Sequence, residues 1–258
     1  MSEGRSEGGA RRRNLKLTVA YDGTRFHGFQ RQAGRDMPTV QQALEEAWNR
    51  LTGEAVKVIG AGRTDAGVHA LGQVVNFRTG VFSIPVERVP HAFNSVLPRD
   101  VAVLDCAEAP SSFHARFDAR SKLYEYRVLN RTFPSPVERL YTYHVSAPLD
   151  VEAMQEGARL LVGTHDFSAF AGSGAKGRSP VRTLTRCCVW REGEQVRFAV
   201  EGDGFLYRMV RNIVGTLLQV GLGKEEPRWV GEVLASRNRA KAGPTVPAHG
   251  LYLVAVFY

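Results

Sequence analysis

The chain has 258 residues, 43% of them hydrophobic, which is enough to bury the core of one large domain or of two small ones. The net charge of +8 favours a polyanionic partner, such as a nucleic acid or an anionic membrane surface. The longest apolar run, 213–222, is too short to span a bilayer, and the three cysteines form neither a disulfide framework nor a Cys-x-x-Cys metal site. We therefore expect a cytoplasmic protein with no membrane segment and no metal.

The start of the chain, 1–14, is rich in serine, glycine and glutamate and then carries the basic run Arg11-Arg12-Arg13. It lacks the apolar segment of a signal peptide. We interpret it as a flexible basic tail. Its composition leaves two roles open, because such a tail either contacts phosphates or is merely a solvated end.

The apolar pattern of residues 15–104 predicts the order strand, helix, strand, strand, helix, strand. The first helix is the best defined, because Thr39-x-x-Gln42 is a capping box and Gly53 is placed to end it. The predicted elements are a strand at 15–21, a helix at 39–53, strands at 56–59 and 74–77, a helix from near 85 to 98, and a strand at 101–104. This order is typical of the ferredoxin-like fold.

The second half of the chain faintly repeats this plan. Leu51-Thr-Gly53 ends a helix before a short strand and a Gly-rich loop, and Leu161-Val-Gly163 does the same. The predicted elements are a strand at 122–129, a helix at 151–161, a short strand at 167–170, a hairpin of 183–190 and 195–200, helices at 205–222 and 227–235, and a strand at 251–257. The sequence therefore predicts an α/β (α+β) fold. Two ferredoxin-like, or RRM-like, halves with antiparallel sheets, 15–117 and 118–258, would join into one mixed body.

The most distinctive motif is a Gly-rich segment between two apolar runs, Gly60-Ala-Gly-Arg-Thr-Asp-Ala-Gly-Val-His69. Arg63 and Asp65 are two residues apart, so on extended backbone they would point the same way, and the guanidinium would favour the charged carboxylate. The segment lacks the third glycine of a dinucleotide-binding loop and the Gly-Lys-Ser/Thr of a P-loop. An aspartate in such a loop usually caps or turns the chain, and the alternative is a nucleophile or a base.

Four strings of this sequence resemble the tRNA pseudouridine synthases of the TruA family, namely 21–30, 62–69, 113–126 and 204–215. The resemblance implies the pseudouridine synthase fold. It also implies a homodimer that isomerises uridine to pseudouridine at positions 38, 39 and 40 of the tRNA anticodon stem-loop. Catalysis in this family uses an aspartate and needs no metal and no cofactor.

The resemblance also assigns roles to single residues. Asp65 matches the catalytic nucleophile, and Arg63 either orients this aspartate or holds out a neighbouring base. Tyr124 matches the tyrosine that stacks on the target uracil and is a candidate for proton transfer, and Leu251 matches an apolar wall of the pocket. From their spacing alone, Tyr124 and Leu251 would be interpreted as core residues.

Arg211 is a further catalytic candidate, within the predicted helix at 205–222. Helical spacing places it at the rim of the apolar face, where it suits an ion pair with Asp65. The alternative is a surface arginine that snorkels. Basic residues grouped with glycines and aromatics suit contacts with RNA, namely Arg31, Arg116, Arg120, Lys122, Lys176, Arg178 and Arg182.

Three other functions stay open at this point. A sibling pseudouridine synthase would act on another RNA, although the 62–69 string argues against it. A non-catalytic RNA-binding protein would not need Asp65. An acid hydrolase would need a second carboxylate near Asp65, and the loop offers none.

Overall fold

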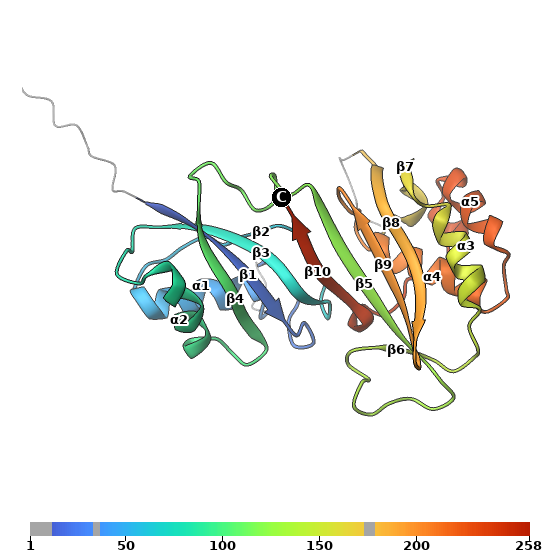
Figure 1. Ribbon diagram of the computed structural model, residues 1–258, viewed down its shortest axis with the longest axis horizontal. Helices are drawn as coiled ribbons and strands as arrows, with labels where there is room; N and C mark the ends of the chain where they lie inside the picture. The colour runs from blue at the N-terminus through green and yellow to red at the C-terminus, as the bar shows by residue number, and fades with distance from the viewer. Residues whose placement is uncertain (1–11, 33–36, 173–178) are drawn as a thin grey trace, which may run out of the picture.

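The computed structural model describes residues 12–32, 37–172 and 179–258, which are built around a ten-stranded sheet. The strands are β1 Arg13–Tyr21, β2 Ile59–Gly60, β3 His69–Thr79, β4 Val101–Ala109, β5 Ser121–Asn130, β6 Tyr143–Val145, β7 Gly163–Asp166, β8 Val181–Glu192, β9 Gln195–Gly202 and β10 Leu251–Phe257. The α-helices are α1 Val40–Thr52, α2 Val89–Val96, α3 Val151–Arg159, α4 Met209–Gly221 and α5 Pro227–Ser236. Figure 1 shows α1 and α2 at one end of the elongated molecule and α3, α4 and α5 at the other.

Both halves of the chain have the ferredoxin-like strand order. The first half, β1-α1-β2-β3-α2-β4, gives the spatial order β4-β1-β3-β2. The second half gives the matching order β10-β5-β9-β8, with α3 after its first strand and α4 before its last. The predicted fold of two such halves joined into one mixed body is confirmed, and the halves share a single ten-stranded sheet. We propose that the halves divide between residues 117 and 118, in the segment from β4 to β5.

The two halves are joined by β10, which lies in the middle of the sheet (Figure 1). On one edge β10 is antiparallel to β5, and on the other it is parallel to β3, where Tyr252 pairs with His69. Because β1 occupies one edge of β3, β10 and the short β2 share the other edge, and Gly60 of β2 pairs there with Val75. The Gly-rich loop 61–68 therefore leaves this edge of β3 between the part that pairs with β2 and the part that pairs with β10.

The core of the first half follows from the predicted periodicity of its helix. Trp48 of α1 is fully buried, with its ring 5.0 Å from that of Phe77 and 5.5 Å from that of Phe93. Thr39 Oγ1 accepts a hydrogen bond from Gln42 N at 3.3 Å, which confirms the N-cap. The Gln42 side chain bonds Glu46 instead of the cap, so only one half of the capping box forms.

Two predicted elements of the second half are wrong in type or extent. The strand predicted at 167–170 is instead the 3₁₀ helix Ser168–Phe170, and the strand β7 precedes it. The reason is local, because Asp166 Oδ1 accepts hydrogen bonds from the amide and the hydroxyl of Ser168 and so begins a turn. The helix predicted from 205 begins at Met209, because Arg208 has a left-handed backbone, with φ of 58°.

Further differences from the prediction occur in the short elements. The helix predicted from 85 begins as the 3₁₀ turn Val86–Arg88 and becomes α-helical only at Val89. The strand predicted at 56–59 is reduced to Ile59–Gly60, which pair with Asn76 and Val75 of β3. The strand β6 was not predicted, and it pairs with β5 in parallel orientation.

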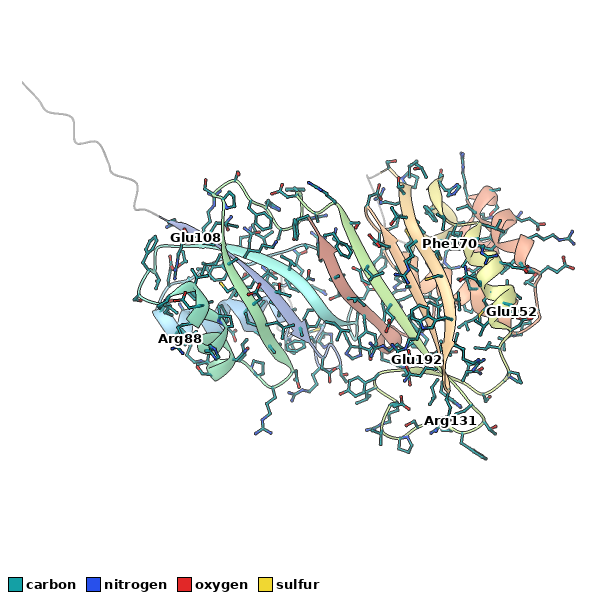
Figure 2. The ribbon with its side chains drawn as sticks, in the orientation of Figure 1. Arg88, Glu108, Arg131, Glu152, Phe170 and Glu192 are labelled. Carbon is teal, nitrogen blue, oxygen red and sulfur yellow. The ribbon has the colours of Figure 1, made fainter. Side chains whose placement is uncertain are left out.

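A long connection without regular structure links β5 to β6. Arg131 Nη1 lies 2.9 Å from Glu194 Oε2 in the β8–β9 turn, and Figure 2 shows Arg131 and Glu192 at this same end of the sheet. Further along, the Tyr141 hydroxyl donates to Asp22 Oδ2 at 2.8 Å, so the connection also contacts the first half of the chain. Within the described ranges, none of the helices has the length and apolar character needed to cross a bilayer.

Candidate active site

The Gly-rich loop between β2 and β3 is fixed by side chains from the strands on either side of it. Gln73 Nε2 donates to Gly62 O at 2.8 Å, and Gln73 Oε1 accepts from Gly62 N at 3.3 Å. The Tyr21 hydroxyl and Thr64 Oγ1 are hydrogen-bonded at 2.8 Å, and Phe29 N donates to Thr64 O at 3.2 Å. These bonds hold the first part of the loop, 62–64, in place against its neighbours.

The string at 21–30 supports this loop from behind. A Cβ on Gly23 would lie 2.0 Å from Val68 O, so the two backbones touch and only glycine fits there. Phe26 and Phe29 are only 7% and 3% exposed, so these aromatic residues belong to the core. The resemblance at 21–30 thus reflects support of the loop by packing.

Asp65 is ion-paired with Arg211 of α4, which is the first of the two alternatives considered for this arginine. Arg211 Nη1 lies 3.0 Å from Asp65 Oδ2, and the two side chains are 13% and 26% exposed. Arg211 Nε also donates to Val246 O at 2.8 Å, so the guanidinium is held on two sides. Arg63 is exposed, and among the described residues it has neither an ion pair nor a hydrogen bond, so the partner of Asp65 is Arg211.

Tyr124 of β5 faces the same loop. It is 7% exposed, and its hydroxyl is 3.5 Å from the position that a Cβ on Gly62 would take. Its ring meets that of Phe205 edge-on, with centroids 5.0 Å apart. Burial raises the pKa of Tyr124, and the nearby Tyr21 and Asp65 raise it further, so the side chain is a neutral phenol at physiological pH.

Lys122 and Leu251 lie on either side of Tyr124. Lys122 precedes Tyr124 by two residues on β5, so both point to one face, and its methylenes are 3.5 Å from the Cβ position of Gly62. Burial lowers the pKa of Lys122, and the charge of Arg116 lowers it further. Leu251 begins β10, is 6% exposed, and pairs in register with Tyr126.

Comparison with known proteins shows the family of this chain. A family model described as tRNA pseudouridine synthase matches residues 17–118 and 158–258. This chain belongs to the tRNA pseudouridine synthase family. It is 50% identical over 246 residues to the tRNA pseudouridine synthase A of Acetivibrio thermocellus, a match that covers 95% of this chain and 100% of that protein.

Two further relatives agree with this assignment. The tRNA pseudouridine synthase A of Thermoanaerobacter sp. is 48% identical over 246 residues, covering 95% of this chain and all of that protein. The corresponding protein of Halalkalibacterium halodurans is 49% identical over 240 residues, covering 93% and 90% of the two chains. A chain in the crystal structure of a Cbf5-Nop10-Gar1 complex is 17% identical, with a TM-score of 0.32 over 79% of this chain and 45% of that one. The assignment rests on the sequence matches.

His69 is a residue of this candidate site that sequence reasoning did not single out. It is 2% exposed, and its Nδ1 accepts a hydrogen bond from Gly23 N at 3.1 Å. Its Nε2 lies 3.1 Å from Leu140 O and 3.2 Å from His249 O, and its ring stacks on Tyr252 at 4.9 Å. His69 thus ties the end of the Asp65 loop to segments from both halves, and burial lowers its pKa.

Asn212, next to Arg211, is a second residue that was missed. It is fully buried, and its Nδ2 donates to Phe170 O at 2.7 Å. Its Oδ1 accepts from Thr245 Oγ1 at 2.5 Å and from Arg239 Nη2 at 3.2 Å. These bonds fix the start of α4 and so the position of Arg211. A polar residue inside an apolar helical face was the signal that could have revealed it.

Among the residues predicted to contact RNA, Arg31 and Arg120 are exposed, Arg116 and Arg182 are half-buried, and Lys122 is buried, at 9% exposed. Arg31 is exposed and its Nη1 is 3.5 Å from Glu45 Oε2. Arg116 is half-buried, with its guanidinium 5.9 Å from the centre of the Phe117 ring. Two of the predicted residues, Lys176 and Arg178, lie outside the described residues.

Proposed function

We propose that this chain isomerises uridine to pseudouridine at positions 38, 39 and 40 of the tRNA anticodon stem-loop, with Asp65 as the nucleophile. The observation that carries the proposal is the 3.0 Å ion pair between Asp65 and Arg211, beside the buried Tyr124 in a chain of the pseudouridine synthase family. The relatives at about half identity are named tRNA pseudouridine synthase A, which supports tRNA as the substrate.

The reaction breaks the bond from N1 of uracil to C1′ of ribose and forms a bond from C5 to C1′. The proton on C5 is lost, and N1 gains a proton. Arg211 holds Oδ2 of Asp65, and Oδ1 has no partner in the part of the chain that the structure describes. Attack at C1′ and attack at C6 both use a carboxylate with one such open oxygen.

The neighbours of Asp65 suit the other needs of this reaction. Tyr124 is a neutral phenol, so it can pack on the uracil and donate a hydrogen bond. The target nucleotide must leave its stack, at a cost of a few kcal/mol. The exposed Arg63 suits the role of holding a neighbouring base outside the stack, and Leu251 suits that of an apolar wall.

We further propose that the enzyme acts as a cytoplasmic homodimer, with no metal and no cofactor. The basic residues Arg31, Arg116, Lys122, Lys176 and Arg178 would contact the tRNA backbone. Light scattering of the purified protein should give about twice the 28.5 kDa mass of one chain. A mass of one chain at micromolar concentration would contradict the dimer.

Tritium release tests the activity directly. The substrate is unmodified tRNA labelled at C5 of uridine, and the two proteins are the wild type and Asp65→Asn, a variant of nearly equal shape. We expect release by the wild type alone, and mapping of the product sites then identifies the uridines. Tight tRNA binding with no tritium release by either protein would indicate that the chain is a non-catalytic RNA-binding protein and not an enzyme.

A further inference from the structure

His114 and Phe117 form a stacked pair on the surface, in the segment between β4 and β5. Their ring centroids are 4.2 Å apart with an angle of 30° between the planes, and Phe117 is 72% exposed. His114 Nδ1 accepts hydrogen bonds from Arg116 N at 3.2 Å and Phe117 N at 3.3 Å. Asp118 Oδ2 in turn accepts from His114 N at 2.9 Å. Single exposed apolar residues are common, but these bonds present two rings to solvent in a fixed arrangement.

A basic groove of about 480 Å³ lies next to this pair, and His114 is part of its wall. Lys57 and Arg78 line it and are exposed, and Arg78 is fixed by a 2.8 Å bond to Ser111 O. The groove also contains the carboxylate of Glu54, which is held by the Thr79 hydroxyl and by Gly80 N. The open groups of the groove are therefore cationic.

The stacked pair and the groove both border the Asp65 loop. Ile59, the residue before Gly60, lines the groove and leads directly into that loop. On the other side, the charge of Arg116 acts on Lys122, whose side chain packs against Gly62. Ala61 at the start of that loop and Ala115, next to His114, also belong to one buried cluster, which places the stacked pair beside the loop.

We propose that His114 and Phe117 form a stacking platform for an unpaired base of the substrate RNA other than the target uridine. The groove with Lys57 and Arg78 takes phosphates of the same strand. Single-stranded RNA is held in this way, by bases stacked on aromatic or histidine rings and by cations along the backbone. An anticodon stem-loop offers unpaired bases beside its stem. The inference rests on the proposed function, because it takes that RNA as the substrate.

The test compares Phe117→Ala with the matched variant Phe117→Tyr, which keeps a ring. Binding of unmodified anticodon stem-loop RNA is measured by fluorescence anisotropy, and isomerisation is measured in single turnovers at saturating enzyme. Phe117→Ala should raise Kd about 5- to 50-fold, whereas Phe117→Tyr should stay within about twofold of the wild type. The saturated rate should be unchanged in both, because the ring does not touch the reacting atoms.

The salt dependence of RNA binding distinguishes the contribution of the stacking platform from that of the groove. Stacking releases no counterions, so Phe117→Ala should leave the slope of log Kd against log salt unchanged. Lys57→Ala should reduce that slope by about 1, and Lys57→Arg should retain it. An unchanged slope in Lys57→Ala would remove the groove from the proposal.

The remaining outcomes are distinct from each other. Unchanged RNA affinity in Phe117→Ala, with an active wild type, overturns the platform and leaves the proposed function in place. Unchanged RNA affinity together with a halved mass in light scattering would make Phe117 a contact between protein copies, which also overturns it. No isomerisation by the wild type would overturn the proposed function itself. Because Phe117 is 72% exposed, both variants should have the same melting temperature as the wild type, measured by circular dichroism.

Discussion

The guanidinium of Arg211 lies 3.0 Å from the carboxylate of Asp65, across 146 residues of sequence. Asp65 follows β2 in the first half of the chain, whereas Arg211 belongs to α4 in the second half. The ion pair therefore forms only when the two ferredoxin-like halves are packed together. The site is a property of their junction and of neither half alone.

Arg211→Ala should reduce turnover on the order of 10²-fold, because Asp65 loses the group that orients it. Arg211→Lys keeps the charge but cannot donate to both Asp65 and Val246 from one planar group, so it should be intermediate. Tritium release at saturating tRNA measures both variants, and thermal melting shows whether they fold. Full activity of Arg211→Ala would remove this residue from the catalytic site.

Tyr124→Phe should keep at least about tenfold more activity than Tyr124→Ala. The physical reason is the raised pKa, which leaves the tyrosine as a neutral packing surface whose ring matters more than its ionisation. Single-turnover isomerisation compares the two variants, and the wild-type rate should show no titration of this phenol up to pH 10. Equal losses in both variants would point instead to an essential hydroxyl.

Gly23→Ala should lower activity by displacing the Asp65 loop, although Gly23 itself is not a catalytic residue. Its new Cβ would lie 2.0 Å from Val68 O, so the backbone of the Asp65 loop must move, and we expect at least tenfold lower activity and a loss of about 1–3 kcal/mol of unfolding free energy. Gly193→Ala is the matched control. Gly193 has φ of 59° but nothing within 4 Å of its Cβ position, so it should cost about 1–2 kcal/mol and leave activity unchanged. Unaltered activity in Gly23→Ala would mean that the loop tolerates displacement.

Acidification should destabilise the protein through His69. Burial lowers the pKa of His69 below its ordinary value of 6.5, and the same is true of His249 beside it. Below about pH 6.5 the unfolded chain therefore binds more protons than the folded one, so the unfolding free energy falls as the pH falls toward the folded pKa. Urea unfolding between pH 5 and 8 measures this slope.

His69→Gln is the variant for this pH dependence. It should be less stable at pH 8, because the contacts to Gly23, Leu140 and His249 are altered, but its slope between pH 5 and 6.5 should be shallower than that of the wild type. The attraction of Asp22, 3.2 Å from Nδ1, acts against the shift and limits its size. An unchanged slope would assign the pH dependence to His249 or to other groups.

The sequence predicts well those features that depend on local pattern. The period of α1, its Thr39 cap and its end at Gly53 are all set by residues within one helix, and each was predicted correctly. The ferredoxin-like order followed from such elements in sequence. Local pattern failed where one residue takes an unusual conformation, as at Arg208, because a left-handed residue leaves no trace in hydrophobic periodicity.

The site was predictable only in part, for a different reason. Arg211 was singled out by the family-like string 204–215 and by its position on a helical rim, which are both local properties, whereas the contacts of His69 with Leu140 and His249 depend on which distant segments meet. The spacing of Arg63 and Asp65 suggested a shared direction on extended backbone, but the loop turns and Asp65 meets Arg211 instead. The pairing of β10 with β3 could not be predicted either, because the alternation of apolar and polar residues identifies a strand but not the strand that pairs with it.

The position of β10 also affects how an active molecule is made. This strand is the last of the sheet in chain order, yet it lies between β3 and β5 in the centre. A ribosome therefore releases every other strand before the one that joins the two halves, and it brings out Leu251 long after Asp65. The first half can fold early as a unit, but the second half lacks its own fourth strand until β10 emerges, so the pocket forms only when that strand enters the gap between β3 and β5.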